Sequence, residues 1–233
     1  MSSSNLEILA YEHTDLGPLC LRRRELLSSP GTVVTEITLN HEFLMSSLHT
    51  DSEQALARVA LELHSGRELD VLVGGLGLGY TAHEALQSSR VARVVAVELL
   101  PQVVEWMRTD QLPLSRTLME EERLSVETAD AYARLLAPPT ETFDIILVDI
   151  DHAPQDRLGD ADDGFYTEEG LRRVRRHLAP GGVLGVWSWA ESPPFARALE
   201  RVFETVHVKP VTFFNQHVDK ERTDWLFFGT DRA

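Results

Sequence analysis

The stretch DVLVGGLGLGY, residues 70–80, decides the fold of this chain. Its apolar beginning is typical of a buried strand, and a helix is predicted from about Tyr80. Between the two, Gly75, Gly77 and Gly79 alternate along the turn. Glycine lets a backbone adopt positive φ and approach a ligand closely, and a helix that begins there offers free N–H groups. We therefore predict a strand–turn–helix unit that cradles a ligand.

An acidic residue stands at the end of the next apolar run. Glu98 follows Val94–Val97 and lies nineteen residues after Gly79. A carboxylate in that position can bind both hydroxyls of a ribose. A glycine turn alone is a weak signal. Because a strand precedes it, a helix follows it and an acid ends the next strand, we favour a nucleotide-like ligand over a tight turn without one.

The order of elements predicts the fold class. From residue 68 onward, apolar runs alternate with amphipathic segments, which is typical of a parallel α/β sheet. The late apolar runs Val206–Phe214 and Trp225–Gly229 predict an antiparallel hairpin at the sheet edge. The expected fold is Rossmann-like, with a mostly parallel sheet and helices on both faces. We predict strands near 70–74, 93–98, 123–128, 143–149 and 182–188, and helices near 80–89, 101–109, 130–136, 167–178 and 193–203.

The first fifty residues have a different pattern. Short apolar runs between residues 6 and 40 are broken by glycine and proline, which predicts a small antiparallel sheet. Residues 41–49 either continue this sheet or loop over the ligand cleft. We expect residues 1–50 to form a small N-terminal β-sheet region. Residues 51–233 are expected to form the Rossmann-like domain, which begins with a helix at Asp51.

Composition narrows the class of protein. The chain has 233 residues, enough for one sizeable domain, and its formal net charge of −15 argues against binding to a nucleic-acid backbone. The same charge suits a cationic substrate, although acidity can simply keep a protein soluble. No apolar run is long enough for a membrane span, and we see no secretory signal. The single cysteine, Cys20, fits a reducing compartment, so we expect a cytoplasmic protein.

Ligands of open parallel sheets bind outside the carboxyl ends of the strands. That rule selects the glycine turn, Glu98 and two later segments, residues 128–131 and 149–154. In the first of these, Asp130 lies where it can bind an adenine amino group. It can equally cap the next helix, and both roles can hold together.

The segment 149–154 follows a continuous buried run and is acidic. Carboxylates at the mouth of a cleft can bind an ammonium group, and one of them can accept its proton. Asp149, directly at the strand end, is the best candidate, with Asp151 beside it and His152 as a possible second base. The acids between residues 156 and 163 are more simply a solvated loop. Because calcium-loop spacing is absent, we expect no metal site.

With the glycine turn, Glu98, Ala129-Asp130 and Asp149 in this order, the chain resembles the class I S-adenosylmethionine-binding transferases. Within them it is most similar to the spermidine synthase (polyamine aminopropyltransferase) superfamily, over residues 50–190. The resemblance implies that Gly75–Gly79 hold the amino-acid part of S-adenosylmethionine or of its decarboxylated form. It also implies that Glu98 binds the ribose, that Asp130 binds the adenine and that Asp149 is the strand-end aspartate that serves aminopropyl transfer, in contact with the cofactor. A homodimer is the assembly that it suggests.

The chain departs from the family pattern in the residues that would choose the reaction. Aminopropyltransferases usually read G-G-G-D-G-G in the turn, and the aspartate holds the amine of decarboxylated S-adenosylmethionine. Here Gly77 stands in its place and should tolerate the carboxylate of ordinary S-adenosylmethionine. The family acids after the fourth strand are three apart, whereas Asp149 and Asp151 are two apart and His152 holds the second position. Ser52 replaces a family tyrosine.

These departures favour methyl transfer. We expect a transferase that uses S-adenosylmethionine to methylate a small or cationic acceptor, such as an amine, by in-line displacement. Asp149, with Asp151 or His152, would orient the acceptor and remove its proton. The first alternative is aminopropyl transfer from decarboxylated S-adenosylmethionine to putrescine or another amine. The second is a nucleotide-binding protein without catalysis.

Overall fold

The computed structural model describes residues 6–150, 164–215 and 220–231, and within them it contains two sheets. The smaller sheet is antiparallel and its strands follow one another in chain order. Its strands are β1 (Leu6–Thr14), β2 (Gly17–Glu25), β3 (Val33–Leu39) and β4 (Glu42–Ser46). The predicted N-terminal sheet is therefore confirmed, and β4 shows that the segment 41–49 continues it.

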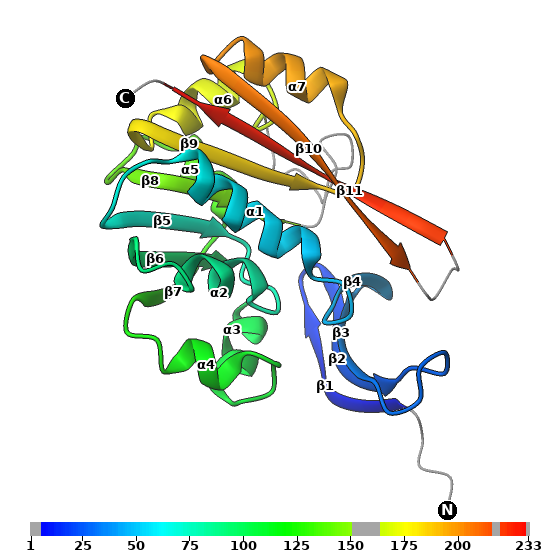
Figure 1. Ribbon diagram of the computed structural model, residues 1–233. Helices are drawn as coiled ribbons and strands as arrows, with labels where there is room; N and C mark the ends of the chain where they lie inside the picture. The colour runs from blue at the N-terminus through cyan, green and yellow to red at the C-terminus, as the bar shows by residue number, and fades with distance from the viewer. Residues whose placement is uncertain (1–5, 151–163, 216–219, 232–233) are drawn as a thin grey trace, which may run out of the picture.

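The larger sheet has seven strands in the order β10-β11-β9-β8-β5-β6-β7 (Figure 1). The five neighbouring strands β9, β8, β5, β6 and β7 run parallel to one another. Strands β11 and β10 extend the sheet beyond β9 and are antiparallel. The predicted fold, with its edge hairpin, is confirmed. The strands are β5 (Leu69–Gly74), β6 (Val91–Glu98), β7 (Leu124–Thr128), β8 (Phe143–Val148), β9 (Leu178–Ser188), β10 (Thr205–Asn215) and β11 (Lys220–Thr230).

Helices connect the strands where alternation predicts them, although α2 and α7 end three residues before their predicted limits of 89 and 203. There are two further differences. The short helix α4 was not predicted, and the helix expected over 167–178 ends at Arg175. Strand β9 instead begins at Leu178, because Leu178 pairs with Phe143 of β8 and recruits the following Pro-Gly-Gly segment into the strand. The helices are α1 (Asp51–Leu63), α2 (Tyr80–Leu86), α3 (Pro101–Arg108), α4 (Ser115–Met119), α5 (Ala131–Leu136), α6 (Glu168–Arg175) and α7 (Pro193–Glu200).

The sheet separates two apolar layers. Side chains alternate across a strand, so Val71 and Val73 of β5 join one cluster while Leu72 joins the other. Helices α1, α2 and α3 pack on the first face, and α5, α6 and α7 pack on the second. Burial of these faces is what holds the sheet and its helices together.

The N-terminal sheet docks on the first layer. Leu21 and Ile37 are fully buried in the same cluster as α1. A polar contact adds to this docking, since Trp106 Nε1 of α3 donates to Glu12 Oε1 of β1 at 3.1 Å. The two sheets thus share one core, and the division into domains at residue 50 stays a prediction.

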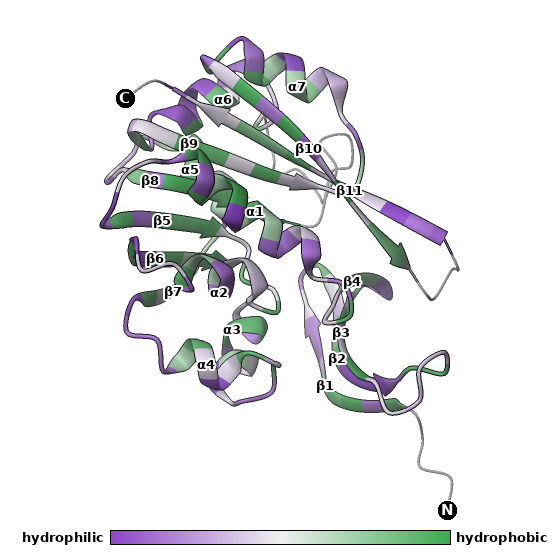
Figure 2. Cartoon of the chain, viewed as in Figure 1, coloured by the Kyte–Doolittle hydropathy of each residue, from purple (hydrophilic) through white to green (hydrophobic). Residues whose placement is uncertain are grey.

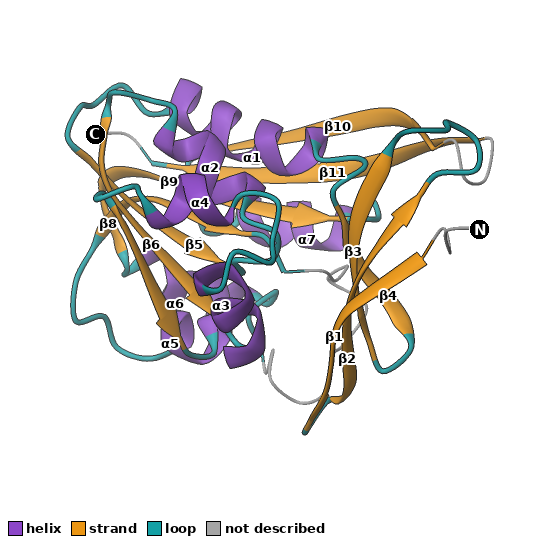
Figure 3. Cartoon of the chain, turned by 90° about the horizontal axis from the view of Figure 1, so that it is seen from below, coloured by secondary structure: helices purple, strands orange, loops and turns teal. Residues whose placement is uncertain are grey.

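The edge hairpin reaches beyond the rest of the sheet. Strands β10 and β11 pair along their whole length, but only Trp225–Thr230 of β11 pair with β9. The free part extends toward the N-terminal sheet (Figures 1 and 3), and its end on β11 is hydrophilic (Figure 2). There the ring of Phe213 packs on His49, just before α1, with centroids 4.7 Å apart. The overhang therefore brings β11 side chains to the start of α1.

Candidate active site

The glycine turn joins β5 to α2 and touches the end of β8. Gly75 has φ +92°, and a Cβ atom on it would lie 2.2 Å from the carbonyl oxygen of Asp149. Its N–H donates to Val97 O of β6 at 2.8 Å. Only glycine permits this approach, so the turn lies directly beside Asp149.

Gly77 allows a second close approach, from the N-terminal sheet. Its φ is +52°, and a Cβ atom there would lie 2.9 Å from Met45 Sδ of β4. Gly79, with φ +92°, is the N-cap of α2. The left-handed backbone predicted for the turn is confirmed at all three glycines, whereas their role in binding a cofactor stays a prediction.

Glu98 is occupied within the protein. Its Oε2 accepts hydrogen bonds from the N–H groups of Leu76 at 3.0 Å and Gly77 at 3.2 Å, and its Oε1 accepts from Leu100 at 2.9 Å. Burial raises the pKa of this carboxyl, and the backbone hydrogen bonds oppose the rise. A carboxylate has about four lone-pair sites, so these contacts already occupy most of them. Glu98 shapes the glycine turn, and its predicted contact with a ribose is not tested by the structure.

Asp130 is the N-cap of α5. Its Oδ1 accepts from the N–H of Ala133 at 3.0 Å, which is the local role predicted for it. One carboxylate oxygen remains for the second role, the recognition of an adenine, which stays a prediction.

Asp149 lies at the carboxyl end of β8, where the sheet rule places ligands. Its Oδ2 accepts a short hydrogen bond from the hydroxyl of Thr81 in the first turn of α2. Desolvation raises the pKa of Asp149 to about 6, the charge of Asp224 adds to the rise, and the bond from Thr81 opposes it. Near neutral pH this carboxyl can therefore change its protonation with little cost.

Two further carboxyls face Asp149 from other elements. Glu53 is in the first turn of α1 and Asp224 is on the overhang of β11. The buried hydroxyl of Ser52 lies between them, 3.0 Å from Glu53 Oε2 and 2.7 Å from Asp224 Oδ2. A hydroxyl has one proton to donate, so both contacts are hydrogen bonds only when one of the two acids is itself protonated.

The electrostatics of the three acids agree with this geometry. Burial, and then the charge of Asp149, raise the pKa of Glu53 to about 8. Burial also raises the pKa of Asp224, against the hydrogen bond from Ser52 and the charge of the exposed Arg222. These acids, which we call the acid cluster (Glu53, Asp149 and Asp224), form a site that favours a positive charge.

Two aromatic residues border the acid cluster. Burial and the charge of Glu53 raise the pKa of Tyr80, while a hydrogen bond with Ser47 lowers it. Trp187, near the end of β9, is 8% exposed, and its proximity favours the charged form of Asp224. Trp187 borders the cluster, and Trp189 is 52% exposed.

Sequence reasoning missed Glu53 and Asp224. They stand 96 residues before and 75 residues after Asp149 in the chain, so no motif joins them. The weak signal in the sequence is an acid in the first turn of a helix, and another directly before the last apolar run. Asp151, His152 and the acidic loop 156–163 lie outside the described residues, so their predicted roles are not tested.

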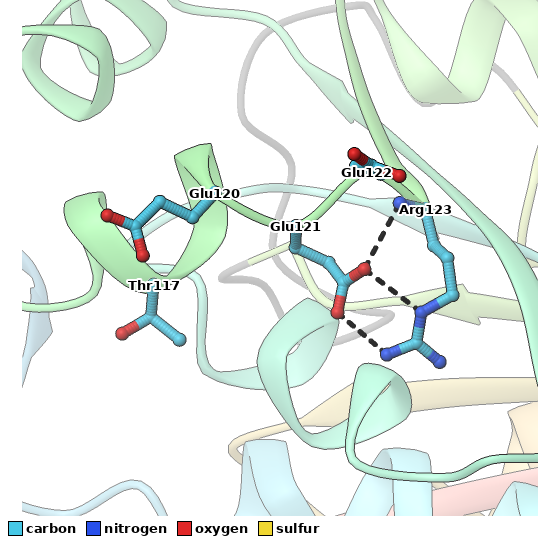
Figure 4. A pocket seen from close by; sticks show the side chains of 5 residues that line it. All are labelled: Thr117, Glu120, Glu121, Glu122 and Arg123. Atoms are coloured by element: carbon cyan, nitrogen blue, oxygen red, sulfur yellow. Dashed lines mark hydrogen bonds and ion pairs between the residues drawn. The ribbon is translucent and has the colours of Figure 1, made fainter.

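A surface groove elsewhere does not belong to this site. It is lined by Thr117, Glu120, Glu121, Glu122 and Arg123, in the connection from α4 to β7 (Figure 4). That is the amino end of β7, whereas the glycine turn follows the carboxyl end of β5. Arg123 donates to Glu121 at 2.7 Å and lowers the pKa of Glu121 to about 2, so the one cation that lines the groove is already paired.

The described part of the chain lacks two kinds of feature. No helix in it is long and apolar enough to cross a membrane. It also contains no group of three or more histidine, cysteine, aspartate or glutamate side chains arranged to hold a metal ion.

Comparison with curated proteins finds polyamine aminopropyltransferases among the relatives of this chain. The chain is 34% identical over 153 residues to a polyamine aminopropyltransferase of Oceanobacillus iheyensis. The aligned region covers 64% of this chain and 28% of the relative. The chain is also 30% identical over 171 residues to polyamine aminopropyltransferase 2 of Pseudomonas aeruginosa. This aligned region covers 67% of this chain and 47% of the relative. The matches thus span less than half of these two relatives. No family model matches the chain.

Solved structures share the fold. A spermidine synthase in complex with the transition state analogue AdoDATO superposes with a TM-score of 0.75 at 20% identity, over 96% of this chain and 73% of that one. Spermidine synthase from Thermotoga maritima gives 0.74 at 19% identity, over 96% and 72%. Human methyltransferase-like protein 13 gives 0.57 at 20% identity, over 78% and 82%. The solved structures show that the chain has the fold of spermidine synthase, and the sequence relatives support its placement in the spermidine synthase-like superfamily of class I S-adenosylmethionine-dependent transferases.

Proposed function

We propose that this protein transfers an aminopropyl group from decarboxylated S-adenosylmethionine to an amine. The observation that carries the proposal is Asp149, a desolvated carboxyl that lies against the glycine turn and faces two more acids. The names of the sequence relatives support the same reaction. They favour the alternative stated above over the methyl transfer that we expected from the sequence.

The residues around the turn fit an adenosyl substrate. Glu98 has room to accept one ribose hydroxyl beside its three backbone bonds. Leu99, next to it, is 49% exposed and offers an apolar surface to a flat base. Asp130, with one oxygen free of the helix cap, can accept from an adenine amino group. These contacts would hold the donor with its sulfonium end toward Asp149.

Asp149 would serve as the base. The amine nitrogen forms a bond to the terminal carbon of the aminopropyl chain next to sulfur, the carbon–sulfur bond breaks, and 5′-methylthioadenosine leaves. The proton of the attacking nitrogen passes to the carboxylate of Asp149. A pKa of about 6 makes Asp149 mostly ionised at neutral pH, yet basic enough to take the proton. Orientation of the two substrates supplies most of the acceleration in such a displacement.

The test is product analysis with both donors. The protein is incubated with putrescine and decarboxylated S-adenosylmethionine, and separately with putrescine and S-adenosylmethionine, and the products are identified by mass spectrometry. We expect spermidine and 5′-methylthioadenosine from the first mixture. The same assay is repeated with spermidine as the acceptor. If neither acceptor yields an aminopropylated product and 5′-methylthioadenosine, the proposal is overturned.

One observation favours methyl transfer as the second candidate. Gly77 offers no carboxylate to the amine of decarboxylated S-adenosylmethionine, and Met45 fills the space next to it. S-adenosylhomocysteine and a methylated amine from the second mixture would support this candidate.

A further inference from the structure

We propose that Thr81 is a positioning residue for the base: its hydroxyl group holds the side chain of Asp149 in place and keeps it ionised, ready to accept a proton. The inference rests on the proposed aminopropyl transfer, in which Asp149 receives the proton of the attacking nitrogen. Thr81 belongs to α2 and acts on the reaction only through Asp149.

The backbone around Thr81 and Asp149 brings the two side chains together. The N–H of Asp149 donates to Gly74 O at 2.8 Å, which joins the end of β8 to the end of β5. Gly79 is the N-cap of α2, and Thr81 follows in the first turn of that helix. Thr81 is 2% exposed, and a β-branched side chain has few rotamers in a helix. Burial and restricted rotation therefore hold its hydroxyl group beside Asp149 Oδ2.

The hydroxyl group of Thr81 has a second neighbour, which lets it serve both protonation states of Asp149. Its oxygen makes a short hydrogen bond with Asp149 Oδ2 and lies 3.3 Å from the carbonyl oxygen of Glu53 in α1. A hydroxyl group donates one proton and accepts through its lone pairs, so Thr81 donates to Asp149 when Asp149 is ionised. Once Asp149 has taken a proton, it can donate to the Thr81 oxygen, and the proton of Thr81 then turns to the carbonyl of Glu53. Neither state leaves a buried polar group at this contact unsatisfied, which would be costly.

The surroundings of Asp149 otherwise oppose its ionisation. Burial raises the pKa of Asp149 to about 6, the hydrogen bond from Thr81 acts against this rise, and the charge of Asp224 adds to it. The titratable and charged groups around the contact are Glu53 of α1, Tyr80 of α2, and Asp224 and Arg222 of β11. Arg222 is exposed and acts on the pKa of Asp224. The hydroxyl group of Thr81 is thus the neighbour that favours the ionised form of Asp149, which is the form that a base requires.

The experiment separates the hydroxyl group of Thr81 from the space that its side chain fills. Thr81→Val removes the hydroxyl group but keeps the size and branching of the side chain, whereas Thr81→Ala removes the same group and introduces a strong helix former. Thr81→Ser keeps the hydroxyl group. The control is Ser115→Ala, which also removes a buried hydroxyl group from the first turn of a helix, where it accepts from the N–H of Leu112 at 3.1 Å.

Two readouts report the state of Asp149. The first is the pH dependence of aminopropyl transfer, whose acidic limb follows the ionisation of the base. The second is the pH titration of the Asp149 carboxyl carbon, observed by NMR in protein labelled with carbon-13 aspartate and assigned by its loss in Asp149→Asn. Because the second readout needs no turnover, it tests the contact independently of the proposed reaction.

We expect Thr81→Val and Thr81→Ala to raise both the acidic limb and the titration midpoint of Asp149 by about one to two pH units, since a hydrogen bond to a charged group contributes on that scale. Turnover at pH 7 should fall about fivefold, because less of the base is ionised, whereas the affinity for 5′-methylthioadenosine should stay within about twofold. Thr81→Ser and Ser115→Ala should keep both readouts within about 0.3 pH units of the parent.

The proposal is overturned if Asp149 titrates in Thr81→Val and Thr81→Ala as it does in the parent. It is also overturned if Thr81→Ser shifts the midpoint as far as they do, because packing rather than the hydroxyl group would then set the ionisation of Asp149. A parent that forms no aminopropylated product, while these two variants shift the midpoint, would refute the proposed reaction and leave the role of Thr81 toward Asp149 in place. If Thr81→Val does not fold, the titration of Thr81→Ala decides.

Discussion

The carboxyl groups in the two halves of the site, around the glycine turn and around Asp149, differ in how completely the protein satisfies them. On the donor side, Glu98 is buried but satisfied by three backbone N–H groups. On the proposed acceptor side, the acid cluster has hydroxyl partners, and the charge of Asp149 raises the pKa of Glu53 while that of Asp224 raises the pKa of Asp149. A satisfied carboxylate stabilises the fold, whereas mutually opposed carboxyls favour a cation from outside. The same residue type thus organises a turn at one strand end and, in the proposed function, forms a binding site at another.

The largest effect should come from removing the proposed base, Asp149. Asp149→Asn keeps the size of the side chain but cannot accept the proton, and general bases contribute about 10²- to 10⁴-fold. We expect a loss of turnover of about 10³-fold, with affinity for decarboxylated S-adenosylmethionine within twofold, measured by steady-state kinetics and calorimetry. Turnover that stays within threefold would remove the role of Asp149 as base.

The donor side should respond in stability first. Glu98→Ala leaves the N–H groups of Leu76, Gly77 and Leu100 without their acceptor. We expect the free energy of unfolding to fall by about 2–4 kcal/mol, measured by urea denaturation. Glu98→Gln retains an acceptor oxygen and should lose about half as much. Equal stability of the Ala variant and the parent would mean that Glu98 does not shape the turn.

The acceptor side should respond through pH. The pKa of Glu53 is raised from 4.5 to about 8, so the folded state holds this proton more tightly than the unfolded chain. Its contribution to stability is complete below pH 4.5 and is lost as pH rises through 8. The free energy of unfolding of Glu53→Gln should equal that of the parent at pH 4.5 and exceed it at pH 8.5 by on the order of 2 kcal/mol. The measurement is urea denaturation across this range, and parallel curves would contradict it.

The smallest effect separates two roles of one residue. Asp130→Ala removes the N-cap of α5 and should cost about 1 kcal/mol. Asp130→Ser restores a cap but not a carboxylate, so it should recover most of the stability. If Asp130 also binds adenine, Asp130→Ser will still weaken donor binding severalfold in calorimetry. Unchanged donor affinity would leave only the capping role.

The order of elements and the donor side of the site were predictable because their signals are local. A strand, a glycine turn and a helix form one continuous segment, and the positive φ of Gly75 follows from that turn. The cap at Asp130 also depends on a neighbour three residues away. The helix limit at Arg175 was not predictable, because Phe143 of another strand extends β9 by pairing with Leu178.

By itself, the sequence determined the α/β fold, the small N-terminal sheet, the edge hairpin and the place of Asp149. The reason is that hydrophobic periodicity and strand ends depend on residues that are adjacent in the sequence. Only the tertiary structure decided what faces Asp149. Glu53 depends on the packing of α1, Asp224 on the overhang of β11, and Met45 on the docking of the N-terminal sheet. These positions follow from contacts between segments far apart in the chain, and such contacts leave no pattern along it.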